Sequence, residues 1–388
     1  MLANRLLPLL LLSTLALPSL VQAQYRYTTE RLVTGMTGRS DYESSRATVI
    51  GNDGTVGGRY NIPETWFDQA YLWKNGVFTY IPNKPGEVFN HFITGINDHG
   101  GVALNFNYSD TSSGEGQYYH NGVFTPIPRV NYMGNARVNA INNHGMLVGD
   151  AGMGLDDWTT PPDRHTFIYQ NGVTTDIGTL GGRFAYAQGV NDAGVVVGGS
   201  LNAAGVMRAF IYDAAGMHEL GTLGGATSHA YDVNQAGDVV GMSQTADGEW
   251  HGFLYRNGTM TDIGLMEQYS ALDLDINDAG QIIGKGWLNG AYRPVLLENG
   301  VMTDVQTYID PADRFQLSAV EGLNDHGQIV GTGCYTSPVG EWSCTGVLLS
   351  PVPEPATWGM LGAGLGVLAF YGRRRSWGAG GAWRVTRG

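Results

Sequence analysis

Short stretches in which apolar and polar residues alternate recur along most of the chain, and each is bounded by Gly or Asn. In residues 189–200, GVNDAGVVVGGS, such a stretch follows a turn that Asn191 opens and Gly194 closes with a positive φ. A second kind of turn is an Asn-Gly pair between two strand-like runs, which fits a two-residue type I′ hairpin loop. These pairs are Asn75-Gly76, Asn121-Gly122, Asn171-Gly172, Asn257-Gly258 and Asn299-Gly300, with residues 213–216 as a longer turn in the fourth repeat. The pattern predicts two β-hairpins in every repeat.

The first kind of turn returns with a regular period. The residues that open it are Asn52, Asn97, Asn142, Asn191, Asn234, Asn277 and Asn324, at spacings of 45, 45, 49, 43, 43 and 47 residues. Repeats of this length with four strands each are typical of β-propeller blades. We therefore predict an all-β, seven-bladed β-propeller of four-stranded repeats. A β-solenoid is the alternative, although it seldom needs an Asn-Gly hairpin in every coil.

The two ends of the repeat region fit a closed ring. The last repeat contains two strands and then residues 345–350, but no fourth strand follows. Residues 25–33, YRYTTERLV, form a spare strand before the first repeat. Pairing this N-terminal strand into the last blade would close the ring and remove an exposed sheet edge.

Composition supports a β protein and limits its partners. The chain of 388 residues has 58 Gly, and 43% of its residues are hydrophobic, so short strands joined by tight turns can bury a sizeable core. Of the 22 Lys and Arg, six lie in residues 1–23 and 373–388, which leaves 16 against 35 Asp and Glu, a net charge of −19. Such a surface repels phosphate backbones, so nucleic acid is not an expected partner.

The N-terminus has the pattern of a secretory signal peptide. Residues 1–23 contain one early Arg5 and a long apolar run, and Val21-Gln22-Ala23 fits the small-x-small cleavage site before Gln24. We expect Sec-dependent export and removal of residues 1–23 by signal peptidase.

The only two cysteines, Cys334 and Cys344, lie ten residues apart in an exported chain, and this predicts a local disulfide. Two unpaired buried thiols are the alternative. A metal site would need more ligands than this segment offers.

Residues 351–388 combine three features of a sorting signal. Pro353-Glu354-Pro355 precedes a 17-residue apolar span, 356–372, and Arg373-Arg374-Arg375 follow it. The span predicts a membrane helix that stops temporarily in the inner membrane, with the arginines on the cytoplasmic side. The pattern resembles the PEP-CTERM sorting signal, which implies processing by an exosortase, a membrane transpeptidase of Gram-negative bacteria that make extracellular polysaccharide. An ordinary C-terminal anchor is the alternative, and the 13 residues after Arg375 depart from the family pattern.

The repeats resemble those of the HAF-repeat family of exported bacterial proteins. The nearest matches are RAFIYDAAGMHELGTLGG (208–225), HTFIYQNGVTTDIGTLGG (165–182) and HGFLYRNGTMTDIG (251–264). The resemblance covers about residues 45–350. It implies an extracellular repeat protein, and it brings no activity with it. The predicted domains are the signal peptide 1–23, the propeller 24–350 and the sorting signal 351–388.

No motif predicts a metal, a cofactor or a catalytic nucleophile. Residues 273–280, DLDINDAG, begin like a calcium loop, but Asp278 and Gly284 stand where an EF-hand needs Gly and Glu. We interpret this segment as a strand with Asp273 and Asp275 on one face. Neither Gly-x-Ser-x-Gly nor His-Glu-x-x-His occurs.

The segments that join the two hairpins of each repeat hold the candidate ligand-binding residues. Five of the seven contain or adjoin a tryptophan, namely Trp66, Trp158, Trp250, Trp287 and Trp342, and the longest adds Asp156 and Asp157. Indole rings can stack on sugars and carboxylates can accept sugar hydroxyls, so a polysaccharide-binding face is one hypothesis. The alternative is that each Trp packs on its own blade.

We predict a non-catalytic cell-surface or extracellular-matrix protein that binds polysaccharide. The competing hypothesis is a carbohydrate-active enzyme, a glycoside hydrolase or lyase. Three or more carboxylates converging at one end of the ring axis would favour the enzyme, and a broad Trp-lined face without them would favour binding.

Overall fold

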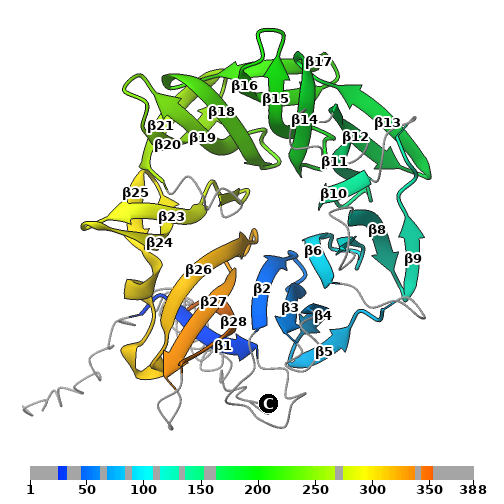
Figure 1. Ribbon diagram of the computed structural model, residues 1–388. Coiled ribbons are helices and arrows are strands. Elements are labelled where there is room, and N and C mark those ends of the chain that lie inside the picture. The colour runs from blue at the N-terminus through cyan, green and yellow to red at the C-terminus, as the bar shows by residue number, and fades with distance from the viewer. Residues whose placement is uncertain are drawn as a thin grey trace, which may run out of the picture. The chain divides into compact units, whose positions relative to one another are not determined.

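The computed structural model describes residues 25–32, 45–61, 68–83, 90–107, 114–130, 136–152, 163–266, 274–336 and 342–352. Residues Tyr27–Pro351 form one compact unit, and Met1–Arg26 with Val352–Gly388 form a second. In the compact unit the strands surround a central axis in a β-propeller arrangement (Figure 1). The described part is nearly all β, with two short 3-10 helices, η2 (Val305–Tyr308) and η3 (Pro311–Asp313).

Five of the sheets are separate and have four antiparallel strands each. The first sheet consists of β2 (Ser45–Ile50), β3 (Val56–Asn61), β4 (Asp68–Lys74) and β5 (Val77–Tyr80). The second consists of β6 (Asn90–Ile96), β7 (Val102–Asn107), β8 (Gly114–His120) and β9 (Val123–Pro126). Two more are β18 (Gly224–Val233), β19 (Val239–Thr245), β20 (Trp250–Arg256), β21 (Thr259–Leu265), and β22 (Asp275–Ile276), β23 (Ile282–Leu288), β24 (Ala291–Glu298), β25 (Val301–Asp304). The fifth is β1 (Tyr27–Leu32), β28 (Trp342–Pro351), β27 (Ile329–Thr336), β26 (Gln316–Leu323).

The third and fourth repeats form a single eight-stranded sheet, so the prediction of seven separate blades is corrected to five four-stranded blades and one double sheet. Its strands are β10 (Ala136–Ile141), β11 (Leu147–Gly152), β12 (Arg164–Gln170), β13 (Val173–Gly178), β14 (Gly181–Val190), β15 (Val196–Asn202), β16 (Met207–Asp213) and β17 (Gly216–Gly221). The pairing of β14 with β15 is interrupted between Gly181 and Ala185. In this gap the backbone of Phe184 forms a parallel bridge to Arg164 of β12, which joins the two repeats.

The Asn-Gly hairpins are confirmed. The five predicted asparagines have φ values from 49 to 53°, and the glycines that follow them have φ values from 77 to 83°. Positive φ at both central residues is the type I′ geometry, which matches the right-handed twist of the flanking strands.

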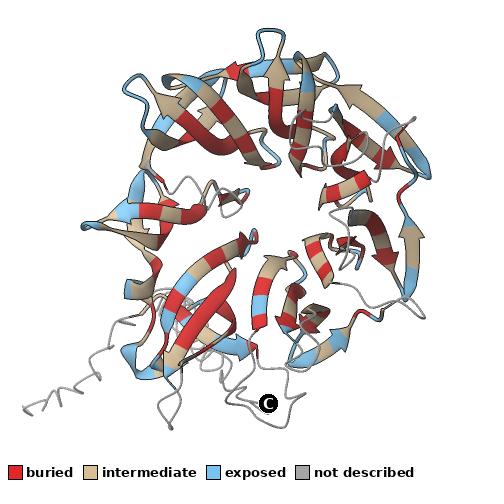
Figure 2. Ribbon diagram, viewed as in Figure 1, coloured by how far each residue is buried: buried red, intermediate tan, exposed pale blue. Residues whose placement is uncertain are grey.

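The spare N-terminal strand does pair into the last blade. β1 is antiparallel to β28 from Tyr27 opposite Pro351 to Leu32 opposite Gly346. Figure 2 shows that buried residues concentrate on the inner and middle strands of the sheets, whereas exposed residues lie mainly on the outer strands and turns. One apolar cluster joins Leu32 of β1 to Tyr71 of β4 and Leu348 of β28, and so packs the first blade against the last.

The seven first turns lie around the axis, and their opening residues are linked. In the later repeats the Asn amide donates to the backbone oxygen of the next opening residue, as from Asn142 Nδ2 to Asn191 at 2.9 Å and from Asn324 Nδ2 to Gly51 at 3.1 Å. Gly51 therefore opens the first turn. The prediction that Asn52 opens it is wrong by one residue. Gly51 makes the same turn bonds, to Thr55 and from Gly54, through its backbone alone.

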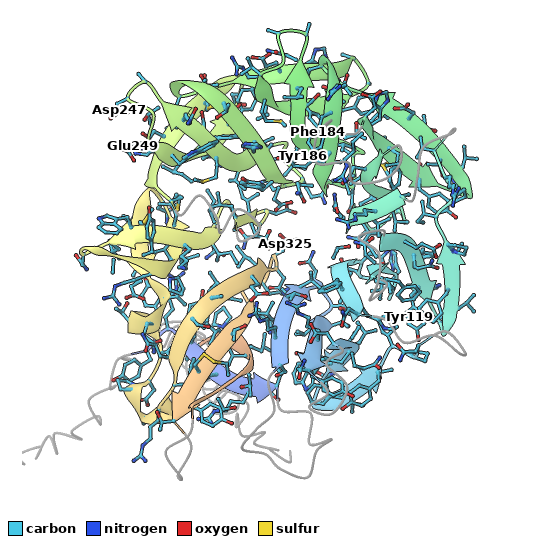
Figure 3. The ribbon with its side chains drawn as sticks, viewed as in Figure 1. Tyr119, Phe184, Tyr186, Asp247, Glu249 and Asp325 are labelled. Carbon is cyan, nitrogen blue, oxygen red and sulfur yellow. A yellow bond between two sulfur atoms is a disulfide. The ribbon has the colours of Figure 1, made fainter. Side chains whose placement is uncertain are left out.

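One position further on, a closed circle of hydrogen bonds unites the turns. The backbone N–H of each residue donates to the side-chain oxygen of its counterpart in the next turn, over 2.8 to 3.0 Å. We call these residues the turn ring: Asn52, Asp98, Asn143, Asp192, Gln235, Asp278 and Asp325. Asp325 lies beside the central opening, whereas Tyr119 lies toward the outside (Figure 3).

Substituting Asp278 tests whether the turn ring depends on an acceptor atom or on charge. Asp278→Ala removes the oxygen that accepts from the Gln235 N–H, and we expect the free energy of unfolding to fall by about 0.5–1.5 kcal/mol. Asp278→Asn keeps that oxygen, as Asn52 and Asn143 do elsewhere in the ring, and should unfold like the wild type. Chemical denaturation measures both, and equal losses in the two variants would contradict an acceptor role.

Candidate functional site

Three adjoining cavities of about 670, 190 and 200 Å³ follow the propeller axis, and together we call them the channel. The turn ring lines the 190 Å³ end. The 670 Å³ end is lined mostly by residues that precede the turns, with Gly58 and Arg59 of β3 in addition. We call the first strands of the repeats the inner strands: β2, β6, β10, β14, β18, β22 and β26. Asp232 and Asp275 line all three cavities.

A β-bulge in six of the inner strands directs one side chain into the wide end of the channel. In β2, for example, the pairing with β3 skips from Ala47 to Val49, and Thr48 lines the cavity. A bulge leaves its extra residue unpaired and re-aims the side chain. The six skipped residues are Thr48, Thr94, Asn139, Gln188, Tyr231 and Glu321. The bulges therefore place polar side chains on a channel wall that also carries apolar residues such as Ile93 and Leu274.

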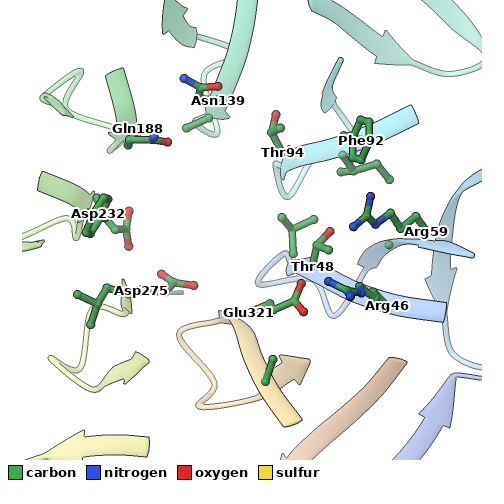
Figure 4. A pocket seen from close by; sticks show the side chains of 17 residues that line it. Arg46, Thr48, Arg59, Phe92, Thr94, Asn139, Gln188, Asp232, Asp275 and Glu321 are labelled. Atoms are coloured by element: carbon green, nitrogen blue, oxygen red, sulfur yellow. The ribbon is translucent and has the colours of Figure 1, made fainter. Parts of the chain in front are cut away.

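Two carboxyl groups from neighbouring inner strands meet on one side of the wide end (Figure 4). Asp232 Oδ2 accepts from the Ile276 N–H at 3.0 Å, and Asp275 Oδ2 accepts from the Leu323 N–H at 2.8 Å. Burial raises the pKa of Asp275 well above its usual range, and the charge of Asp232 and a hydrogen bond to it raise that pKa further. Because like charges in contact repel each other, Asp232 favours the neutral form of Asp275, and we call Asp232 and Asp275 the carboxylate pair.

Two arginines and a glutamate lie on the opposite side (Figure 4). Arg46 of β2 and Arg59 of β3 are direct cross-strand partners. Arg59 Nη1 pairs with Asp68 Oδ2 at 2.8 Å, and its guanidinium lies over the Phe92 ring at 4.8 Å from the centroid. Glu321 Oε1 accepts from Thr332 Oγ1 at 3.3 Å.

From its pattern alone, Asp275 is predicted only to be a strand residue beside Asp273, which lies outside the described residues. The other members of this site are not predicted from the sequence. The signal was present in the repeats. Asp232 and Asp275 occupy the same position of consecutive repeats, 43 residues apart, where the other repeats have small or apolar residues: Val49, Gly95, Ala140, Gly189 and Gly322. Within the described ranges, no group of three or more His, Cys, Asp or Glu is arranged to hold a metal ion.

The two predicted tryptophans whose side chains are described do not line the channel. Trp250 is half-buried and packs against an apolar cluster, with its ring 5.6 Å from that of His229. Trp287 is 46% exposed and makes an edge contact with Tyr292 at 5.0 Å. The contacts of Trp250 are those of the packing alternative. The other candidates lie outside the described residues or, for Trp342, have no described side chain: Trp66, Trp158, Trp342, Asp156 and Asp157.

Cys334 and Cys344 are register partners on β27 and β28, and their sulfurs are bonded. The predicted sorting residues, Pro353-Glu354-Pro355 and Arg373-Arg374-Arg375, and the predicted helix 356–372 lie outside the described residues. Within the ranges that are described, no helix has the length and apolar character needed to cross a membrane.

The sorting motif is recognised by comparison with protein families. The model of the PEP-CTERM protein-sorting motif matches residues 351–375. The motif implies export and sorting to the cell surface, and it is consistent with processing by an exosortase. No curated protein matches the sequence at a significant level.

Solved structures with a similar fold include two enzymes. A puromycin-hydrolysing peptidase of Mycobacterium tuberculosis is 11% identical with a TM-score of 0.51, over 84% of this chain and 52% of the peptidase. This chain thus spans about half the length of that protein. An oligogalacturonate lyase in complex with manganese is 14% identical with a TM-score of 0.51, over 87% of this chain and 96% of the lyase. At these identities the likeness shows the fold alone.

Proposed function

We propose that this protein is a non-catalytic cell-surface or extracellular-matrix protein that binds an extracellular polysaccharide in the wide end of its channel. In this proposal residues 1–23 are removed on Sec-dependent export, and the repeats of the propeller are HAF-like. The exosortase processes the C-terminal signal from an inner-membrane intermediate. The observation that carries the binding function is the 670 Å³ cavity, which receives a polar side chain from nearly every repeat.

The lining of this cavity suits a sugar. Hydroxyl and amide groups of Thr48, Thr94 and Gln188 can both donate and accept hydrogen bonds, as sugar hydroxyls require. Phe92 and Tyr231 add aromatic surface on which the apolar face of a sugar ring can stack. A concave site with few, spread polar groups and aromatic contacts is typical of small-ligand recognition.

A carbohydrate-active enzyme is the second candidate, and one observation favours it. Asp232, Asp275 and Glu321 all line the wide end, which is the convergence of three carboxylates that the sequence analysis set as a criterion for catalysis. A carboxyl with a raised pKa, as at Asp275, is what a general acid requires. However, Asp232 lies close enough to raise the pKa of Asp275, whereas glycoside hydrolysis needs two carboxyls about 5–10 Å apart.

Blocking the channel separates these proposals. We expect Gln188→Trp to fill the wide end and weaken binding of the producing strain's polysaccharide at least about tenfold, a loss of about 1.4 kcal/mol. Trp287→Ala, which changes an exposed aromatic residue outside the channel, should bind like the wild type. Affinity electrophoresis of the exported protein gives both values, with a parallel assay for newly formed reducing or unsaturated sugar ends.

The results distinguish binding in the channel from binding at the tryptophan-bearing segments and from catalysis. Binding lost in Trp287→Ala and kept in Gln188→Trp would move the binding surface to the tryptophan-bearing segments and refute the channel. Release of sugar ends by the wild type would make the protein an enzyme.

A further inference from the structure

We propose that the channel recognises an acidic glycan and that Arg46 and Arg59, the arginine pair, bind a carboxylate of one sugar residue. This inference rests on the proposed function, because it names the chemical class of the ligand for the same cavity. It is carried by two arginines from neighbouring strands that both line the wide end of the channel in an otherwise acidic protein.

The arginine pair is built to hold an anion. Arg46 and Arg59 are directly opposite each other in an antiparallel ladder, and both line the wide end. Like charges at such positions repel and cost stability unless an anion lies between them. Arg46 is exposed and makes no ion pair with a described residue, so its guanidinium is available to a ligand.

Arg59 is held in place before any ligand arrives. Its Nη1 pairs with Asp68, whose backbone N–H in turn donates to Asn90 Oδ1 at 2.8 Å. The flat face of the guanidinium lies over Phe92. Asp68 thus occupies one edge of the Arg59 guanidinium, and Phe92 covers one of its faces. Because a guanidinium has five N–H donors in a planar fork, other N–H groups are left for the carboxylate of a ligand.

The side of the cavity opposite the arginine pair determines the orientation of the bound sugar. The carboxylate pair, Asp232 and Asp275, lies across the cavity from the arginine pair (Figure 4). It repels a ligand carboxylate and accepts hydrogen bonds from sugar hydroxyls. A uronic acid residue therefore fits in one orientation, with its carboxylate toward β2 and β3 and its hydroxyls toward β18 and β22.

Glu321 limits the negative charge that a bound group can carry. It lies on the same side of the cavity as Arg46 (Figure 4) and adds a negative charge beside the arginine pair. A carboxylate with one negative charge is repelled by Glu321 less than it is attracted by the two arginines. A phosphate monoester with two negative charges is repelled more strongly. The chain's net charge of −13 likewise disfavours binding of a polyanion along the outer surface, which confines recognition to the cavity.

The test compares two forms of one ligand. The probes are the producing strain's polysaccharide in its native form and after its carboxyl groups are reduced to hydroxymethyl groups. We expect the exported wild-type protein to bind the native form at least about tenfold more tightly, since a hydrogen bond to a charged group contributes about 1.5–3 kcal/mol. Arg46→Gln should lose most of that difference. Arg183→Gln, which removes an exposed arginine that lies outside the channel lining, should keep it.

The possible failures are distinct. Equal binding of the two forms by the wild type would overturn the acidic ligand and leave the proposed function standing. Binding of neither form would overturn both. Equal losses in Arg46→Gln and Arg183→Gln would assign the effect to overall charge and refute the arginine pair. Arg46→Lys, which keeps the charge but loses the planar fork, should recover only part of the affinity.

Discussion

Leu32→Ala is expected to lower the free energy of unfolding by about 2–5 kcal/mol, one of the largest losses available from a single side chain. Leu32 ends the N-terminal strand β1, is fully buried, and packs against Tyr71 of the first blade and Leu348 of the last. Its removal leaves a cavity at the junction where the ring closes. The first and last blades also share hydrogen bonds, such as that from Asn324 Nδ2 to Gly51, but the apolar contacts of Leu32 form the core of their junction, so weakening them loosens the ring.

The control for this substitution lies on the same strand. Glu30 is exposed on β1, so Glu30→Ala should change the free energy of unfolding by less than about 0.5 kcal/mol. Urea denaturation followed by tryptophan fluorescence measures both variants. If Leu32→Ala unfolded at the same urea concentration as Glu30→Ala, β1 would not be what closes the ring.

The predictable part of this fold rests on local turn chemistry. Asn-Gly pairs need positive φ at two successive residues, which few other pairs adopt, so their hairpins could be assigned from the sequence. Counting strands then showed that the last repeat lacked one, and the spare strand at the N-terminus supplied it. Both inferences depend on single, strongly constrained positions.

The wrong predictions concern features that have no side-chain signal. Gly51 replaces the opening asparagine of the first turn and forms the turn with backbone groups alone, so Asn52 was matched in its place. The double sheet arises from one backbone bridge between Arg164 and Phe184, which an interruption in the ladder permits. Neither event requires a particular residue type.

The site was missed because period-two alternation does not mark a bulge. A strand without a bulge would put Thr48 and Glu321 at ordinary paired positions, and only the register shift sends them into the channel. The arginine pair likewise depends on that shifted register, which sets Arg46 opposite Arg59. An alignment of the repeats against one another would have exposed the carboxylate pair, because its members differ from every other repeat at that position.

Asp275→Asn is expected to raise the stability of the protein at neutral pH and to weaken its pH dependence. An amide oxygen can still accept from the Leu323 N–H, and its NH₂ can donate to Asp232, so the contacts survive without a second carboxyl. Because the neutral amide avoids the cost of ionising a buried carboxyl beside Asp232, the free energy of unfolding at neutral pH should rise by at least about 1 kcal/mol. A gain in stability together with weaker glycan binding would indicate that the pair is kept for its ligand.

The direction of the pH effect follows from the raised pKa of Asp275. Between the usual carboxyl pKa of 3.8 and its raised value in the folded state, the native protein binds more protons than the unfolded chain. The contribution of Asp275 to stability is therefore fully present below pH 3.8 and is lost as the pH rises through the folded-state pKa. Thermal unfolding from pH 4 to pH 8 should show this decline in the wild type and in Asp163→Asn, an exposed control, but not in Asp275→Asn. A decline of equal slope in all three would mean that the raised pKa of Asp275 does not cause the pH dependence.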